Sequence, residues 1–157
     1  MIRAAAFTRR IVPGLWAGAL LCIALIATPA PFATLVQADA GRVVARIFAQ
    51  EAWLSIGLGG LMLMLERRAA AEAAEAGQGS QFTLGMGLAL LALGCTVLGY
   101  YGLQPMIAAA KAGQPTALGF AVLHGLSFGL FAIKIVAVTA LAWRAARAPV
   151  TGSGPSS

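Results

Sequence analysis

Residues 118–143 read LGFAVLHGLSFGLFAIKIVAVTALAW, an apolar stretch in which His124 and Lys134 are the only ionisable side chains. The stretch is longer than the roughly 20 residues that a helix needs to cross the hydrocarbon core of a bilayer. An ionisable side chain at that depth is costly, and in membrane proteins it usually marks a functional position. We therefore predict a membrane-spanning helix here and expect functional residues inside it.

The rest of the chain has the same apolar character. Of its 157 residues, 60% are hydrophobic and 10% are charged, whereas soluble domains carry about 25% charged residues. We therefore predict an all-α integral membrane protein, a four-transmembrane-helix antiparallel bundle that forms a single domain over residues 1–148. The expected spans cover about residues 11–29, 48–66, 82–103 and 118–143. Residues 149–157 are mostly Gly, Ser, Pro and Thr, which predicts a disordered tail.

The second span has the weakest signal. Arg46 and Glu51 leave an uncharged window only over residues 52–65, a length that also suits a re-entrant segment. We prefer a complete crossing because Arg67 and Arg68 close the far end of the window as interfacial anchors. Basic and amide side chains recur at four-residue spacing before the window, which predicts a helix at the membrane surface that continues into the span.

The charges outside the spans predict a topology. The net charge is +6, but the basic residues flank apolar stretches instead of forming one exposed basic face, so we expect no nucleic-acid partner. Cytoplasmic loops carry the excess of Lys and Arg, and this bias places both termini in the cytoplasm. One side collects Arg3, Arg9, Arg10, Arg67, Arg68, Arg144 and Arg147, and the other collects Arg42, Arg46 and Lys111.

Aromatic residues are expected to anchor the helices at the two surfaces of the bilayer. Trp16 and Trp143 would lie at the cytoplasmic interface, and Trp53, Tyr100 and Tyr101 at the outer interface.

Small residues at helical spacing predict where the helices meet. In lipid, helices approach one another through stripes of small residues, and the G-x-x-x-G motif is the best-known example. The chain has two such motifs, Gly14 with Gly18 and Gly125 with Gly129. We expect these glycines to pack helices together within one chain, with a homodimer face as the alternative.

A polar face is predicted on the last span. His124, Ser127 and Lys134 fall within about 80° of one another at 100° per residue, so they share one side of the helix. We expect this side to point into the bundle. Three further polar residues of the other spans, Glu51, Tyr100 and Gln104, would join it in a small cavity that opens outward.

Each of the three ionisable residues also has a structural interpretation. His124 can bond to a backbone carbonyl or to Tyr100 and hold helices in register. Glu51 can pair with Arg46 or Arg42 at the surface instead of with His124. Lys134 can extend its side chain toward the cytoplasmic headgroups.

The chain lacks the residues for most catalytic and metal sites. A zinc site needs three or four Cys, His or carboxylate ligands, and His124 is the only plausible metal ligand. Cys22 and Cys95 are expected to pack as small apolar residues. No Gly-rich phosphate loop or nucleophile motif is present. We expect no enzyme activity and no cofactor.

Several short motifs resemble one family of membrane proteins. They are Leu15-Trp16-Ala17-Gly18, residues 27–32 (ATPAPF), residues 40–48 beginning AGR and ending in Phe48, residues 103–107 (LQPMI) and residues 120–127 (FAVLHGLS). Together they resemble the bacterial domain-of-unknown-function 4149 family, which is related to eukaryotic transmembrane protein 205. The resemblance covers about residues 15–138 and implies a multi-pass protein of the bacterial inner membrane.

The chain departs from that family's pattern at one position. Members carry an asparagine where Phe131 stands, and this chain has Lys134 one turn later. If the asparagine belongs to a shared polar site, the site is altered here.

Three classes of function remain open. The resemblance implies a role in handling or transporting a small solute or metal, because the eukaryotic relative is linked to export. A second class is an accessory or scaffold subunit whose polar face is structural. A third is a haem- or quinone-binding membrane protein. The expected partners are the lipid bilayer and, for a self-associating chain, a second copy.

Overall fold

The computed structural model describes residues 2–77 and 79–147. Every regular element in these residues is helical, which confirms the all-α prediction. The elements are α1 (Ile2–Cys22), η1 (Ile23–Ala27), α2 (Pro29–Thr34), α3 (Gln37–Glu75), α4 (Leu84–Thr96), η2 (Val97–Leu103), α5 (Gln104–Lys111) and α6 (Phe120–Arg147), of which η1 and η2 are π-helical. The predicted tail, 149–157, lies outside the described residues.

These elements join end to end into long apolar rods. The described chain has four rods, as the sequence predicted for the membrane-spanning helices. Four helical stretches are long and apolar enough to cross a membrane: Ala4–Thr34, Gln37–Glu75, Leu84–Lys111 and Phe120–Arg147. Each is longer than the sequence pattern suggested. The weak second span is one continuous helix, so the re-entrant alternative is wrong. At 1.5 Å per residue its 39 residues extend for about 58 Å.

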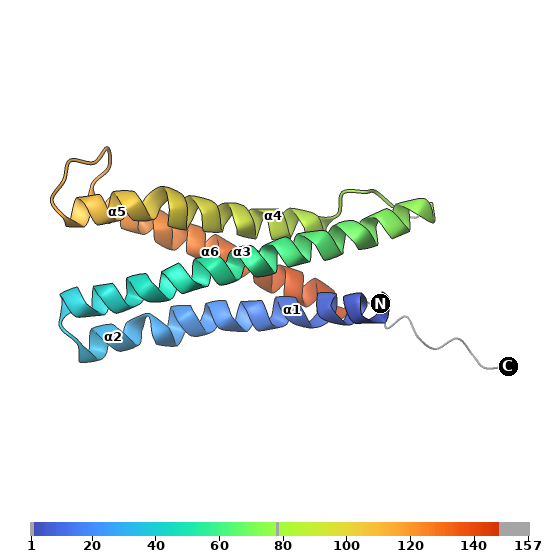
Figure 1. Cartoon of the computed structure of the whole chain (residues 1–157), viewed down its shortest axis with the longest axis horizontal. Coiled ribbons are helices and arrows are strands. Elements are labelled where there is room, and N and C mark those ends of the chain that lie inside the picture. The colour runs from blue at the N-terminus through green and yellow to red at the C-terminus, as the bar shows by residue number, and fades with distance from the viewer. Residues whose placement is uncertain (1, 78, 148–157) are drawn as a thin grey trace.

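The four rods lie side by side (Figure 1). In α1 the chain runs from right to left in this view, returns in α3, goes back through α4 and α5, and returns again in α6. Helix α6 packs against both α1 and α4, and α3 packs against the same two helices. One end of the molecule thus holds α2 and α5 together with the first turns of α3 and α6. We call it the α5 end.

The apolar core fills the other half of the molecule in two layers. The first contains Trp16, Leu20, Ala92 and Val138, and the second contains Met62, Ala89 and Leu141. Trp16 is completely buried, so the prediction that it anchors the chain at the interface is wrong. Its indole N–H has a hydrogen-bond partner inside the protein, so it does not need a partner at the membrane–water interface. Trp53 and Trp143 are exposed, as an anchoring role requires.

The predicted packing of the G-x-x-x-G motifs within one chain is also wrong, and the alternative, a homodimer face, stays a prediction. A Cβ added at Gly14, Gly18, Gly125 or Gly129 would meet nothing within 4 Å. Close approaches occur at Gly59, where an added Cβ would lie 2.7 Å from Leu93 Cδ2 and 3.3 Å from Trp16 Cη2, and at Gly85, where it would meet the Glu66 carboxylate. A glycine pattern marks a helix face that permits close packing, but it does not say that a partner within the chain uses that face.

Each π-helical segment comes immediately before a proline-containing helix. η1 is followed by Thr28 and Pro29, and η2 by Gln104 and Pro105. Proline has no N–H to donate, and its ring clashes with the carbonyl four residues earlier. A π turn contains one extra residue, which changes which backbone N–H and C=O groups bond to each other. The helix can therefore continue past the proline. η2 also carries Tyr100 to the cavity described next.

Candidate functional site

A buried ion pair joins the middle of α3 to α6. Lys134 Nζ donates to both carboxylate oxygens of Glu51, over 2.7 Å to Oε1 and 2.8 Å to Oε2. Both side chains are only 4% exposed. Removing two charges from water costs several kcal/mol per ion in real proteins, and only good geometry and further hydrogen bonds offset that cost. The ion pair between Glu51 and Lys134 has good geometry, and a further hydrogen bond, described next, also reaches the carboxylate.

Two further residues extend the pair to a third helix. The Ser55 hydroxyl, one helical turn after Glu51, donates to Glu51 Oε1. The indole Nε1 of Trp16, on α1, donates to Ser55 Oγ over 3.0 Å. All four side chains are buried. The result is a chain of hydrogen bonds from Trp16 through Ser55 and Glu51 to Lys134, and it fixes the position of the carboxylate.

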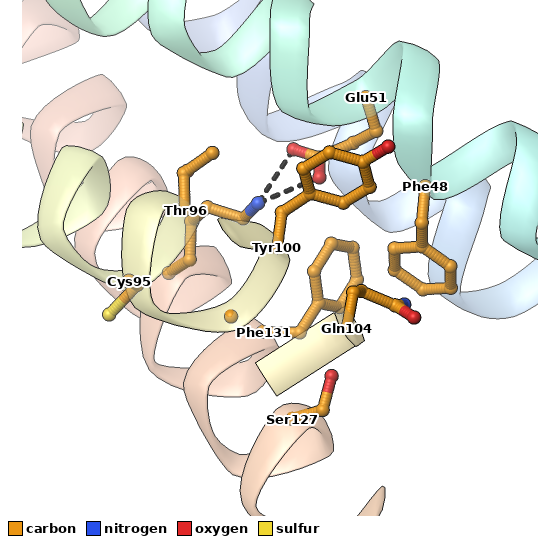
Figure 2. A pocket seen from close by; sticks show the side chains of 10 residues that line it. Phe48, Glu51, Cys95, Thr96, Tyr100, Gln104, Ser127 and Phe131 are labelled. Carbon is orange, nitrogen blue, oxygen red and sulfur yellow. Dashed lines mark hydrogen bonds and ion pairs between the residues drawn. The ribbon is translucent and has the colours of Figure 1, made fainter. Parts of the chain in front are cut away.

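A small cavity of about 30 Å³ lies beside the pair (Figure 2). Dashed lines in that figure mark the two bonds between Glu51 and the ammonium nitrogen. The lining side chains come from α3, α4, η2, α5 and α6, so three of the four rods contribute to it. They are Phe48, Glu51, Cys95, Thr96, Tyr100, Gln104, Ser127, Phe131 and Lys134, together with Gly99.

The polar lining residues on the α5 side of the pair have no protein partner. Tyr100, Gln104 and Ser127 are half-buried, and in the described residues their side chains make no hydrogen bond to the protein. Polar groups that are partly withdrawn from water are normally satisfied by the protein, by water or by a ligand. These three side chains are therefore free to bind whatever occupies the cavity.

Aromatic rings form the walls around the ammonium group. Lys134 Nζ lies 4.8 Å from the ring centroid of Phe131, within the distance at which a cation is attracted to an aromatic face. Phe48 packs edge-on against Phe131, with 5.0 Å between ring centroids. The rings exclude water from one side of Lys134, and the face of Phe131 attracts its ammonium group.

The cavity lies on the α5 side of the apolar core. Val138 follows Lys134 by one helical turn, and Ala92 precedes Thr96 by one turn, and both belong to the first core layer. Phe48, Gln104 and Ser127 lie in the opposite direction along their helices, toward the α5 end. Two apolar layers therefore separate the pair from the far end of the molecule.

The structure brings together five of the six residues in the predicted polar cluster: Glu51, Tyr100, Gln104, Ser127 and Lys134 line one cavity. His124 is not among them, and its inclusion is wrong. It is exposed and stacks on Phe120, with 5.6 Å between ring centroids and an interplanar angle of 14°. His124 lay at the edge of the predicted polar arc, and the buried face of α6 begins with its neighbour Leu123.

The alternatives considered for the two charged residues are also wrong. Glu51 contacts neither the arginines before it nor His124, and Arg42 forms its ion pair with Asp39 instead. Lys134 does not extend toward the headgroups but points into the protein. The pairing of Glu51 with Lys134 is the relationship that sequence reasoning missed. The four-residue spacing of Glu51, Ser55 and Gly59 was the available signal for a shared buried face.

No metal centre is apparent in residues 2–77 and 79–147. No group of three or more His, Cys, Asp or Glu side chains there is arranged to hold a metal ion. His124, the only plausible ligand from the sequence, has no carboxylate or thiol beside it to complete a set. Cys95 is buried at the cavity and Cys22 is exposed, so the two thiols do not form a pair.

The fold and the site define a class: a protein of four helical rods that are long and apolar enough to cross a membrane, with a buried ion pair beside a small polar cavity. A family model described as "Domain of unknown function (DUF4149)" matches residues 11–116. The chain belongs to that family. Comparisons with curated proteins and with solved structures found no match. The matched region contains Trp16, Glu51, Ser55, Tyr100 and Gln104 but ends before α6, which supplies Lys134.

Proposed function

We propose that this protein handles a small polar solute in the membrane, with the Glu51–Lys134 pair and its cavity as the binding site. The observation that carries the proposal is a buried ion pair facing three polar side chains without protein partners. Ionisable residues within membrane helices are rare, and they typically mark substrate, ion or proton pathways. Because Glu51 and Lys134 both line the cavity, a solute bound there would lie beside both charges.

The same proposal includes a membrane arrangement. The chain forms a four-helix antiparallel bundle in a bacterial inner membrane, with both termini in the cytoplasm. We also propose that its family is related to eukaryotic transmembrane protein 205. In support, the described basic residues at the end opposite α5 outnumber those at the α5 end. The positive-inside bias assigns the richer end to the cytoplasm. The cavity then faces the periplasmic side.

A second candidate function is a structural one. The hydrogen-bond chain from Trp16 through Ser55 and Glu51 to Lys134 links three helices, and such a link suits an accessory or scaffold subunit without its own activity. Buried polar networks can specify one arrangement of helices. Under this alternative, the cavity is only the space left beside the network.

A binding assay separates the two candidates. The protein is reconstituted in nanodiscs, and its thermal unfolding is recorded with small anions, cations, zwitterions and neutral solutes. A ligand that binds only the folded state raises the unfolding temperature. We expect one class to do so in the wild type and not in the double variant Glu51→Gln/Lys134→Met. Arg68→Met, which removes an exposed cation at the end opposite α5, is the control and should respond like the wild type.

If no class of solute distinguishes the wild type from the double variant, the solute-handling proposal fails and the structural role is favoured.

A further inference from the structure

We infer that the cavity takes up a small monovalent anion together with one proton. The proton binds the Glu51 carboxylate, and the Lys134 ammonium, released from that carboxylate, pairs with the anion. The inference deepens the proposed function, on which it rests, by naming the class of solute and the ion that accompanies it.

The argument begins with the net charge of the site. In the empty state one carboxylate and one ammonium sum to zero, and both are almost completely buried. An anion that enters alone would leave a net negative charge in a region with little water, and a proton that enters alone would leave a net positive charge. Uncompensated charge in such surroundings is strongly unfavourable. Anion and proton together keep the sum at zero, so their binding is coupled.

The side chains present can satisfy the loaded state. Lys134 has an ammonium group with three donors, two of which now bond to Glu51. In the loaded state these two turn to the anion, and the Phe131 ring at 4.8 Å continues to favour the charged lysine. The hydroxyls of Tyr100 and Ser127 and the amide of Gln104 add uncharged donors without competing protein partners.

The network behind Glu51 also accommodates its protonation. In the empty state the Ser55 hydroxyl donates to the carboxylate and accepts from Trp16. Serine hydroxyls in helices can instead donate to the carbonyl four residues earlier, which here is the carbonyl of Glu51 itself. That rotation leaves a Ser55 lone pair to accept a bond from the protonated carboxyl group. Trp16 Nε1, Ser55 Oγ and Glu51 Oε1 each keep a hydrogen-bond partner in the exchange, and Glu51 Oε2 gives up the donor that turns to the anion.

The charge around the cavity favours an anion over a cation. On the α5 side the described charged residues are Asp39, Arg42, Arg46 and Lys111. Asp39 and Arg42 pair with each other, so Arg46 and Lys111 leave a positive excess that attracts anions to this end. A cation would meet that excess and then the ammonium of Lys134.

The other groups that face the pair do not change its charge near neutral pH. α4 and η2 contribute Cys95 and Tyr100, whose side-chain types are ordinarily uncharged at that pH. α1 contributes Trp16, which does not titrate. The pair is therefore the only place in the described cavity where a proton changes the charge. The volume of about 30 Å³ limits the anion to a few heavy atoms.

Nitrate is a suitable probe, because it is small and stays ionised at every pH used. Calorimetric titration of the nanodisc protein in buffers of different ionisation enthalpy measures nitrate affinity and the number of protons taken up. We expect one proton per nitrate, and an affinity that falls about tenfold for each unit of rising pH while Glu51 is ionised in the empty state.

Two variants make the test specific. Glu51→Gln resembles the protonated carboxyl group, so it should bind nitrate with no proton uptake and no dependence on pH. Glu51→Gln/Lys134→Met lacks both charges and should bind nitrate at least about tenfold more weakly than the wild type at pH 6. Arg68→Met, an exposed position outside the cavity, should keep both the nitrate affinity and the count of one proton per nitrate. Size-exclusion chromatography establishes that each variant is folded.

Binding of nitrate by the wild type without proton uptake would overturn the inference, as would proton uptake that persists in Glu51→Gln. A cation or zwitterion that stabilises the wild type but not the double variant, with no effect of nitrate, would overturn the inference and leave the proposed function standing. If no solute class depends on the pair, both fail.

Discussion

The indole nitrogen of Trp16 donates to the Ser55 hydroxyl over 3.0 Å, and this bond ties the first membrane helix to the carboxylate that pairs with Lys134. Trp16 is 0% exposed and lies in the apolar core. It therefore has two roles, packing through its ring and positioning Glu51 through its nitrogen.

Replacing Ser55 by alanine should destabilise the protein. The change removes the acceptor of the Trp16 N–H and one donor to Glu51, and a buried polar group left unsatisfied costs about 1–3 kcal/mol. Unfolding in mixed detergent micelles measures the free-energy difference. Thr139→Ala, an exposed position on α6, is the control and should change stability by less than about 0.5 kcal/mol. An equally small effect of Ser55→Ala would mean that the bond is unimportant.

Breaking the buried ion pair should cost more than removing it. Lys134→Met leaves the Glu51 carboxylate buried and unpaired, and such a loss typically costs about 3–5 kcal/mol. Glu51→Gln/Lys134→Met leaves no charge and should recover most of that stability. The same unfolding assay, arranged as a double-mutant cycle, yields the coupling between the residues. Additive effects of the two single changes would contradict the observed contact.

Substitution of glycine by alanine should have opposite effects at two positions. Gly59→Ala brings a Cβ to 2.7 Å from Leu93 Cδ2 and 2.8 Å from its Cγ, so the Leu93 side chain or its helix must shift, at a cost of about 1–3 kcal/mol. Gly18→Ala meets nothing within 4 Å and should be neutral or slightly stabilising. Thermal unfolding of both variants compares them. Destabilisation by Gly18→Ala alone would instead point to an interface with a second copy.

Removing the only histidine should have little effect. His124 is exposed, and its one aromatic neighbour, Phe120, is also exposed. We expect His124→Ala to change the free energy of unfolding by less than about 0.5 kcal/mol and to leave nitrate binding unchanged. Calorimetric titration and unfolding of the variant test both expectations. A loss of nitrate affinity would return His124 to the binding site.

The sequence predicted the helices better than it predicted their contacts. Apolar length identifies a spanning helix because the bilayer sets that length, and this holds for all four rods. The depth of Glu51 was misjudged because the charged residues before it suggested a membrane surface, whereas α3 continues as one helix on both sides of it. The charge of Lys134 within an apolar stretch marked it as a site residue. The charge alone does not show that Glu51 is its partner.

Residues that can serve two purposes account for the other errors. Trp16 fits an interfacial position as well as a buried one, and the choice depends on whether Ser55 lies within reach of its nitrogen. Gly18 fits a helix contact as well as an open surface. Both choices depend on how the helices are rotated about their axes, which the pattern of one chain leaves undetermined. Tyr100 and Gln104 were placed near the cavity because they lie at similar heights along the rods.

Because α3 is one uninterrupted helix, a tilt of it about the ion pair would be magnified at its far end. Glu51 and Glu75 belong to the same helix and are separated by about 36 Å at 1.5 Å per residue. A tilt of about 5° around the pair displaces the Glu75 end by about 3 Å. A spin label or fluorophore attached near Glu75, far from the cavity, would therefore report rearrangements of two side chains that no probe of that size can approach directly.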